Sequence, residues 1–393
     1  LARRTLARVG ELLLAGLLSG LGLPACSADA DRDPVLREPA LLIDASALER
    51  LLERTRTLAG TPAGSASMRL LERLNACQEV SAHFDVSATE TSGPSPSSML
   101  EALVCRDDRS LDPRLAEALE RERGEHAGIL QWPIGGTGRL ALVVDVDPSG
   151  GLIVGGALEP SNDAGLGSIL IPGALAPGDA AIDASASLVH LHLRPAAGLR
   201  LAELIPQGSQ GDRLFALKGR LLEGALLEGT LEFAFLPPAT GASVPLAVVA
   251  LHHRAAAPIE AALDEALDQL ERTWGIARTA RRFPVAAGGE RSGGCYADLP
   301  ILPELAPCWV VTENALLVGY RPEALEVALA SRSAPGGDAS RLVVDLDRVR
   351  SVDAKLTRSA TTGLAELYSR LELTGRSEPD GRIALTGLLR ARP

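Results

Sequence analysis

The chain has 393 residues, of which 46% are hydrophobic and 23% are charged. This composition is typical of a globular protein, and the length suffices for two or three domains. The formal net charge of −11 argues against nucleic acid or anionic lipid headgroups as partners. Aromatic residues make up only 3% of the chain, so we expect a core of Leu, Val and Ala.

The first 25 residues have the layout of an export signal. Three arginines lie within the first eight residues, and the uncharged run 12–22 follows them. This run is too short to cross a bilayer, which takes about 20 apolar residues. A basic start, a short apolar run and small residues at its end indicate a signal peptide over residues 1–25.

The stretch Leu23, Pro24, Ala25, Cys26 resembles the lipobox of bacterial lipoproteins. The resemblance covers residues 1–26, and Pro24 departs from it because a small or hydroxylated residue is usual there. It implies that Cys26 becomes the mature N-terminus and that its sulfur carries diacylglycerol, which would bind the protein to a membrane. The alternative is an ordinary signal peptide cut near Ala25, which would leave Cys26 as a free thiol.

Residues 26–38 are expected to form the lipid anchor and a flexible tether. The stretch after Cys26 is acidic, contains Pro34 and shows no hydrophobic period. About a dozen residues of coil span roughly 20 Å on average. We therefore expect a domain held close to a membrane of the cell envelope, on the periplasmic side or at the outer membrane.

The other four cysteines are Cys77, Cys105, Cys295 and Cys308. In an oxidising compartment they allow three pairings, and proximity in the sequence favours Cys77 with Cys105 and Cys295 with Cys308. Four buried free thiols are the alternative. The chain has no C-x-x-C motif, so the cysteines suggest neither zinc binding nor thioredoxin-like redox chemistry.

The order of expected elements predicts an α+β fold with antiparallel sheets and helices packed on them. A strand runs into a helix at 40–60, 187–205 and 341–363, hairpins are expected at 140–160, 309–320 and 369–391, and further strands at 214–235. Helices are expected at 112–124, 258–275 and 321–331, and loops at 89–98 and 288–294. We expect two lobes, 39–178 and 179–393, built from diverged strand–helix–hairpin repeats. The later half resembles two-lobed envelope proteins of bacteria.

Three groups of acidic residues call for an interpretation. The stretch 145–151 is similar to a calcium loop, but Gly156 stands where a bidentate Glu is needed, so we expect a hairpin turn. Acids stand near two expected strand ends, at 41–46 and 343–347, where helix capping is the simpler role. Ser46 and Glu49 have the spacing of a capping box.

Four histidines lie in or just after expected strands. Side chains alternate along a strand, so His190 and His192 share one face. His252 and His253 come after another expected strand, and three imidazoles are enough to bind zinc. Because nothing in the sequence shows that they converge, we interpret them as surface or interface histidines and predict neither a metal site nor a cofactor.

No nucleophile motif is present: the chain lacks G-x-S-x-G, S-x-x-K, H-E-x-x-H and a Walker loop. The sequence therefore favours a non-enzymatic, lipid-anchored envelope protein of binding or scaffolding type, with envelope proteins as partners and no catalytic residues. A carrier that shelters an apolar ligand or lipid between sheet and helices is the first alternative. An envelope hydrolase whose site is assembled from distant residues is the second.

Overall fold

The structure, a computed structural model, describes residues 38–55, 77–83, 103–105, 111–134, 138–159, 181–193, 227–239, 245–253, 256–286, 288–297, 306–330, 340–353, 366–378 and 382–392. The predicted signal peptide, Cys26, nearly all of the tether and the loop at 89–98 lie outside these residues. The chain forms two compact units: Leu1–Ser168 with Thr357–Pro393, and Ile169–Leu356.

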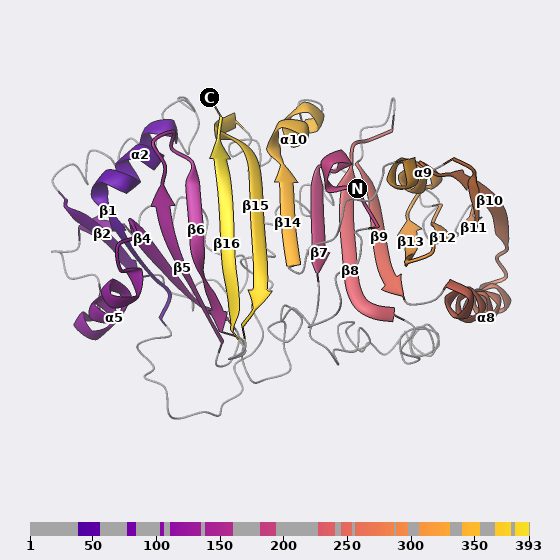
Figure 1. The fold of residues 1–393 in the computed structure, drawn as a ribbon, viewed down its shortest axis with the longest axis horizontal. Coiled ribbons are helices and arrows are strands. Elements are labelled where there is room, and N and C mark those ends of the chain that lie inside the picture. Colours follow the sequence, from indigo (N-terminus) through magenta and orange to yellow (C-terminus); the bar gives the residue numbers. More distant parts are fainter. Residues whose placement is uncertain are drawn as a thin grey trace. The chain divides into compact units, whose positions relative to one another are not determined.

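The first unit is an antiparallel sheet in the order β15-β16-β6-β5-β4-β1-β2-β3 (Figure 1). Its strands form hairpins wherever a short turn joins two apolar runs, as β5 and β6 do. The strands are β1 (Ala40–Asp44), β2 (Glu79–His83), β3 (Val104–Cys105), β4 (Gly128–Ile134), β5 (Gly138–Val146), β6 (Leu152–Glu159), β15 (Tyr368–Ser377) and β16 (Ile383–Ala391).

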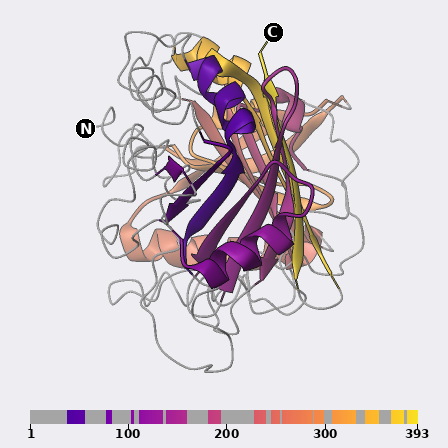
Figure 2. The same ribbon diagram turned by 90° about the vertical axis from the view of Figure 1, so that its left-hand side faces the viewer.

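Helices α2 (Ala45–Thr55) and α5 (Pro113–Arg123) pack on opposite faces of this sheet. Leu48 and Leu52 of α2 contact the face that carries Ile43, whereas Leu115 and Leu119 of α5 contact the face that carries Leu42. Neighbouring strand residues point to opposite faces, so one strand supplies both contacts. Figure 2 shows both helices beside the strands of this unit.

The second unit is an antiparallel sheet in the order β10-β11-β12-β13-β9-β8-β7-β14 (Figure 1). Its strands are β7 (Val189–Leu193), β8 (Leu227–Leu236), β9 (Leu246–His253), β10 (Arg278–Pro284), β11 (Glu290–Tyr296), β12 (Cys308–Val311), β13 (Ala315–Gly319) and β14 (Ser340–Asp345). Its helices are α8 (Ala256–Trp274), α9 (Pro322–Ala330) and α10 (Leu346–Asp353), with a short 3-10 turn η5 (Ala184–Ala186) before β7.

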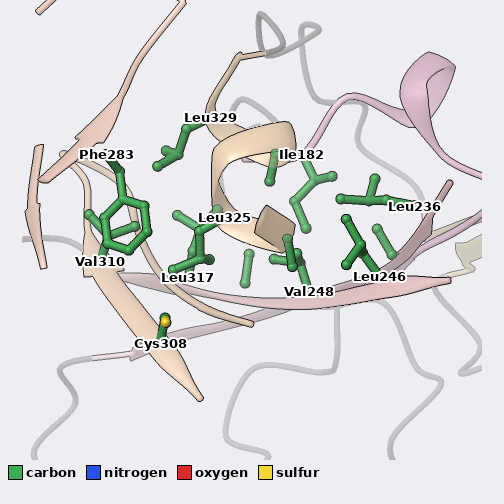
Figure 3. Close-up of a cluster of buried hydrophobic side chains, with 14 of the residues drawn as sticks. Ile182, Leu236, Leu246, Val248, Phe283, Cys308, Val310, Leu317, Leu325 and Leu329 are labelled. Atoms are coloured by element: carbon green, nitrogen blue, oxygen red, sulfur yellow. The ribbon is translucent and has the colours of Figure 1, made fainter. Parts of the chain in front are cut away.

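The main core of the second unit lies between its sheet and α9. Leu325 of α9 lies beside Leu317 and Val248 of the sheet (Figure 3), and all three are buried. On the other face, α8 places Ile259, Leu263 and Leu267 at four-residue spacing against the sheet. The face under α9 is the one on which the candidate site lies.

The predicted α+β class with antiparallel sheets is confirmed, and so are the hairpins expected at 140–160, 309–320 and 369–391. The two units divide the chain differently from the expected lobes 39–178 and 179–393. Residues 357–393 belong to the first unit, because β16 pairs with β6. Among the described residues, no helix is both long and apolar enough to cross a membrane.

The prediction of a loop at 288–294 is wrong, because residues 290–296 form β11, which pairs with β10 and β12. The turn falls earlier, at Gly288 and Gly289, both of which have positive φ angles. A side chain at Gly294 would strike the Trp309 indole on the neighbouring strand, so the glycine serves close strand packing.

Both favoured cysteine pairings are present as disulfides. Cys295 and Cys308 stand directly opposite each other on β11 and β12 and are bonded. Cys77, just before β2, is bonded to Cys105 at the end of β3. Each bond therefore ties neighbouring strands within one unit.

The prediction of a capping box at Ser46 and Glu49 is also wrong. Helix α2 already begins at Ala45, so Ser46 lies inside its first turn. Asp44 instead pairs with Arg123 of α5, at 3.1 Å. Elsewhere capping is confirmed. Asp112 accepts the Arg114 N–H at 2.8 Å, and Asp345 accepts the Arg348 N–H at 2.9 Å.

Candidate functional site

Three histidines and one glutamate converge on the α9 face of the second sheet. His190 and His192 lie two residues apart on β7, and His192 stands opposite Glu232 on β8. Glu232 in turn stands opposite Ala250 on β9, two residues before His252. The period of two and the antiparallel register therefore bring these four side chains, here named the histidine–glutamate cluster, to one face.

Glu232 is the centre of the cluster and is completely buried. Its Oε1 accepts hydrogen bonds from the Ala181 N–H at 2.6 Å and from His252 Nε2 at 2.5 Å. Its Oε2 accepts from the Ile182 N–H at 3.1 Å and from His190 Nε2 at 3.0 Å. Each carboxylate oxygen thus has one backbone donor and one imidazole donor.

Glu232 holds its negative charge inside the protein. Burial by itself would raise the pKa of Glu232, but the hydrogen bonds from His190, His252 and the Ala181 N–H outweigh it and lower the pKa to about 2. The surrounding histidines are 3–6% exposed. Glu232 is therefore a carboxylate at neutral pH with almost no contact with water.

The donor atoms of His192, Glu232 and His252 all lie within 4.8 Å of one another. The His192 and His252 rings meet edge to face, with their centroids 6.2 Å apart. Two imidazoles and a carboxylate are a donor set that zinc and neighbouring transition metals take in proteins. The deep burial of all three residues argues against direct contact with a large substrate.

The interpretation of His190, His192, His252 and His253 as surface or interface histidines is wrong, because all four are buried. Three of the four singled-out histidines meet, whereas His253 points to the opposite face of β9 by alternation. Glu232 is not among the residues that the sequence predicts for a site. The only hint in the sequence that Glu232 is buried is weak. Glu232 lies on the same face of its strand as Ala234 and Leu236, which are buried. The half-buried Phe233 and Phe235 lie on the other face.

The stretch 145–151 is a hairpin turn, as predicted. Asp147 Oδ1 accepts the Ser149 N–H at 2.7 Å and the Gly151 N–H at 2.9 Å, so this carboxylate closes the turn between β5 and β6. Gly150 has a φ of 79°, which suits glycine. These contacts occupy Asp147 with backbone donors in an Asx-type turn.

A second feature is an apolar face on the first sheet. On strands β5, β6, β16 and β15 the cross-strand register places one set of aliphatic side chains on the face that also bears α2. All of them are only half-buried: Leu142, Val144, Leu152, Val154, Leu371, Leu373, Leu385 and Leu389. We call this set the aliphatic face.

Comparison with family models, with curated proteins and with solved structures gives no match for this chain.

Proposed function

We propose that the chain is a lipid-anchored protein of the bacterial cell envelope, of a non-enzymatic binding or scaffolding type. The observation that carries this proposal is the pairing of Cys77 with Cys105 and of Cys295 with Cys308. Disulfides persist in oxidising compartments such as the periplasm and are rare in the cytosol. With four of the five cysteines used in this way, Cys26 is left as the residue for lipid attachment, in agreement with its lipobox-like context.

The energetics support a stable anchor. Each buried CH₂ group contributes about 0.8 kcal/mol to membrane binding, and one acyl chain alone binds only marginally. Two or three chains on Cys26 would hold the protein on the membrane. The two antiparallel units would then present a binding surface to other envelope components, and the strand-to-helix starts at β1–α2 and β14–α10 support their origin from diverged repeats.

The test compares two exported forms of the protein. One carries an ordinary cleavable export signal in place of residues 1–25 together with Cys26→Ser, and the control keeps residues 1–25 and carries Ser27→Ala. We expect the first form in the soluble envelope fraction and the control in the membrane fraction. If the form with Cys26→Ser stays with the membrane, Cys26 is not the anchor.

The carrier of an apolar ligand is a second candidate, and the aliphatic face favours it. Eight half-buried aliphatic side chains on one side of four strands form a surface that an acyl chain would cover. Gly387 lies within this face, where the Leu373 side chain occupies the space of a Cβ. A ligand that covers this face removes apolar area from water, which contributes about 25 cal/mol per Å² to the free energy of binding.

Native mass spectrometry separates the two candidates. The exported form with Cys26→Ser is purified from envelope extract without detergent and weighed under native and denaturing conditions. A carrier would show an added mass of lipid size that denaturation removes. A scaffold would show the mass of the polypeptide alone, and the search for partners would turn to its protein neighbours.

A further inference from the structure

We propose that His192, Glu232 and His252 bind a transition-metal dication of the zinc class, with His190 as a positioning residue for the Glu232 carboxylate. The site is independent of the lipid anchor and of the choice between scaffold and carrier. It rests on the convergence of four buried side chains from β7, β8 and β9. The ligands would be one nitrogen from each of His192 and His252 and one carboxylate oxygen.

The distances suit one ion. Zinc binds imidazole nitrogen and carboxylate oxygen at about 2.1 Å, so two ligand atoms on one ion lie at most about 4.2 Å apart. The three donor atoms lie within 4.8 Å of one another, so the set needs to close by at most a fraction of an ångström. His252 Nε2 and Glu232 Oε1 are 2.5 Å apart, and an ion between them would widen this contact to about 3.4 Å, the spacing of tetrahedral ligands.

The donor types select the class of metal. Calcium and magnesium take oxygen ligands almost exclusively, whereas imidazole suits zinc, copper and nickel. Cys295 and Cys308 of the same unit are joined to each other and supply no thiolate. A site of two imidazoles and one carboxylate is therefore matched to zinc and its neighbours rather than to the hard cations.

The charge of the buried carboxylate favours a cation at this position. Isolated charges are costly to bury, and the burial of Glu232 is complete. Its ionised form is held by four donors, two of which are imidazoles. A dication beside Oε1 would offset the negative charge directly and would take the place of the proton on His252 Nε2, which would move to Nδ1 or be released to solvent. One hydrogen bond would then give way to two metal bonds.

The groups around Glu232 orient it as the outer contacts of metal sites do. The Ala181 and Ile182 N–H groups hold one oxygen each, and His190 holds Oε2, whereas His252 contacts Oε1. Such outer hydrogen bonds fix the direction in which a ligand points, and their loss costs about 10–100-fold in metal affinity. His190 Nδ1 has no hydrogen-bond partner among the described residues, so this ring is held through Glu232.

Bound metal would tie the segment before β7 to the sheet. Residues 181 and 182 contact Glu232 through their backbone, and Ile182 belongs to the main core of the second unit. A ligand that binds only the folded state stabilises it in proportion to its concentration and affinity. We therefore expect the metal to raise the unfolding temperature as well as to bind.

The experiment uses the complete mature chain with Cys26→Ser, exported behind a cleavable signal and purified on an affinity tag that contains no histidine. The protein is freed of metal with a chelator, dialysed, and titrated with Zn²⁺ by calorimetry and with Co²⁺ by visible absorption. We expect one equivalent of each ion to bind, Co²⁺ with the strong absorption of a four-coordinate site. We also expect Zn²⁺ to raise the unfolding temperature.

The Zn²⁺ affinities of four variants test the role of each residue. His252→Ala and Glu232→Gln each remove a ligand, so we expect the Zn²⁺ affinity to fall by more than about 100-fold, beyond the loss typical of an outer contact. His190→Ala is expected to weaken binding by about 10–100-fold while leaving the Co²⁺ spectrum four-coordinate. His126→Ala is the matched control because this histidine is half-exposed on the first unit, and its affinity should equal that of the parent.

Two results would overturn the proposal. One is a parent protein that binds no stoichiometric Zn²⁺ and gives Co²⁺ only the weak spectrum of the hydrated ion, in which case the cluster is a hydrogen-bonded network without metal. The other is a folded His252→Ala protein whose affinity equals that of the parent. If circular dichroism shows that the ligand variants do not fold, the Co²⁺ spectrum of the parent alone decides.

Discussion

Asp145 lies near the end of β5, with its carboxylate held by two donors. Its Oδ2 lies 2.7 Å from His126 Nδ1, and its Oδ1 accepts the Ala127 N–H at 2.9 Å. Partial burial would raise the pKa of Asp145, but these hydrogen bonds outweigh it and the pKa lies below its ordinary value of 3.8. The contacts join the start of β4 to β5, which are neighbouring strands.

The lowered pKa predicts a specific pH dependence. A carboxyl whose pKa is lower in the folded state stabilises the protein above its unfolded pKa, and this contribution is lost as the pH falls. We expect Asp145→Asn to reduce the free energy of unfolding by less than about 1 kcal/mol at neutral pH, because the pair is half-exposed. Urea denaturation should show the difference from the parent shrinking from about pH 5 downward. A difference that stays constant with pH would contradict this account of Asp145.

Glu232 shows at the residue scale why part of the site could not be predicted. In the run 231–236, large aromatic residues alternate with Glu232 and Ala234, and the usual preference puts the aromatics inside. The structure buries the other set, because residues 181 and 182 cover it and donate two backbone hydrogen bonds to the carboxylate. These contacts span about fifty positions of sequence, so no local pattern contains them.

At the scale of elements, local residue patterns predict the hairpins and helix starts, but they do not predict the order of the strands in the sheet. Hairpins such as β5–β6 and β15–β16 carry their turn residues in the sequence, and α5 begins after an Asp–Pro pair. The adjacency of β7, β8 and β9, on which the histidine–glutamate cluster depends, follows from the packing of the whole sheet. Strand β11 was missed because three of its seven residues are polar or charged and two are glycine.

The disulfide between β11 and β12 makes a prediction about element stability. It closes a short loop, with a sequence separation of 13 residues, and loop entropy assigns such a bond about 3 kcal/mol. We expect the double variant Cys295→Ala/Cys308→Ala to lose about that much in free energy of unfolding, measured in urea. The matched pair Cys77→Ala/Cys105→Ala removes the bond of the first unit and should also be destabilised. A Cys295/Cys308 variant within about 0.5 kcal/mol of the parent would contradict the prediction.

At the scale of the molecule, the division of the chain explains why the lobe boundary differed from expectation. The first unit is discontinuous: its sheet is completed by β15 and β16, which follow the entire second unit in sequence. No local pattern in the sequence shows that the chain comes back to the first unit after it has formed the second. The aliphatic face depends on this return, since half of its strands come from the last part of the chain.

The central claim is that an exported protein is anchored through Cys26, and the mass of the N-terminal peptide of the mature protein tests it most directly. The protein is expressed with residues 1–25 in a bacterium, isolated from the membrane fraction, digested and analysed by mass spectrometry. The account predicts that the first residue is Cys26 and that it carries the added mass of a diacylglycerol group. A mature chain that begins at another residue, or at Cys26 with an unmodified thiol, would contradict it.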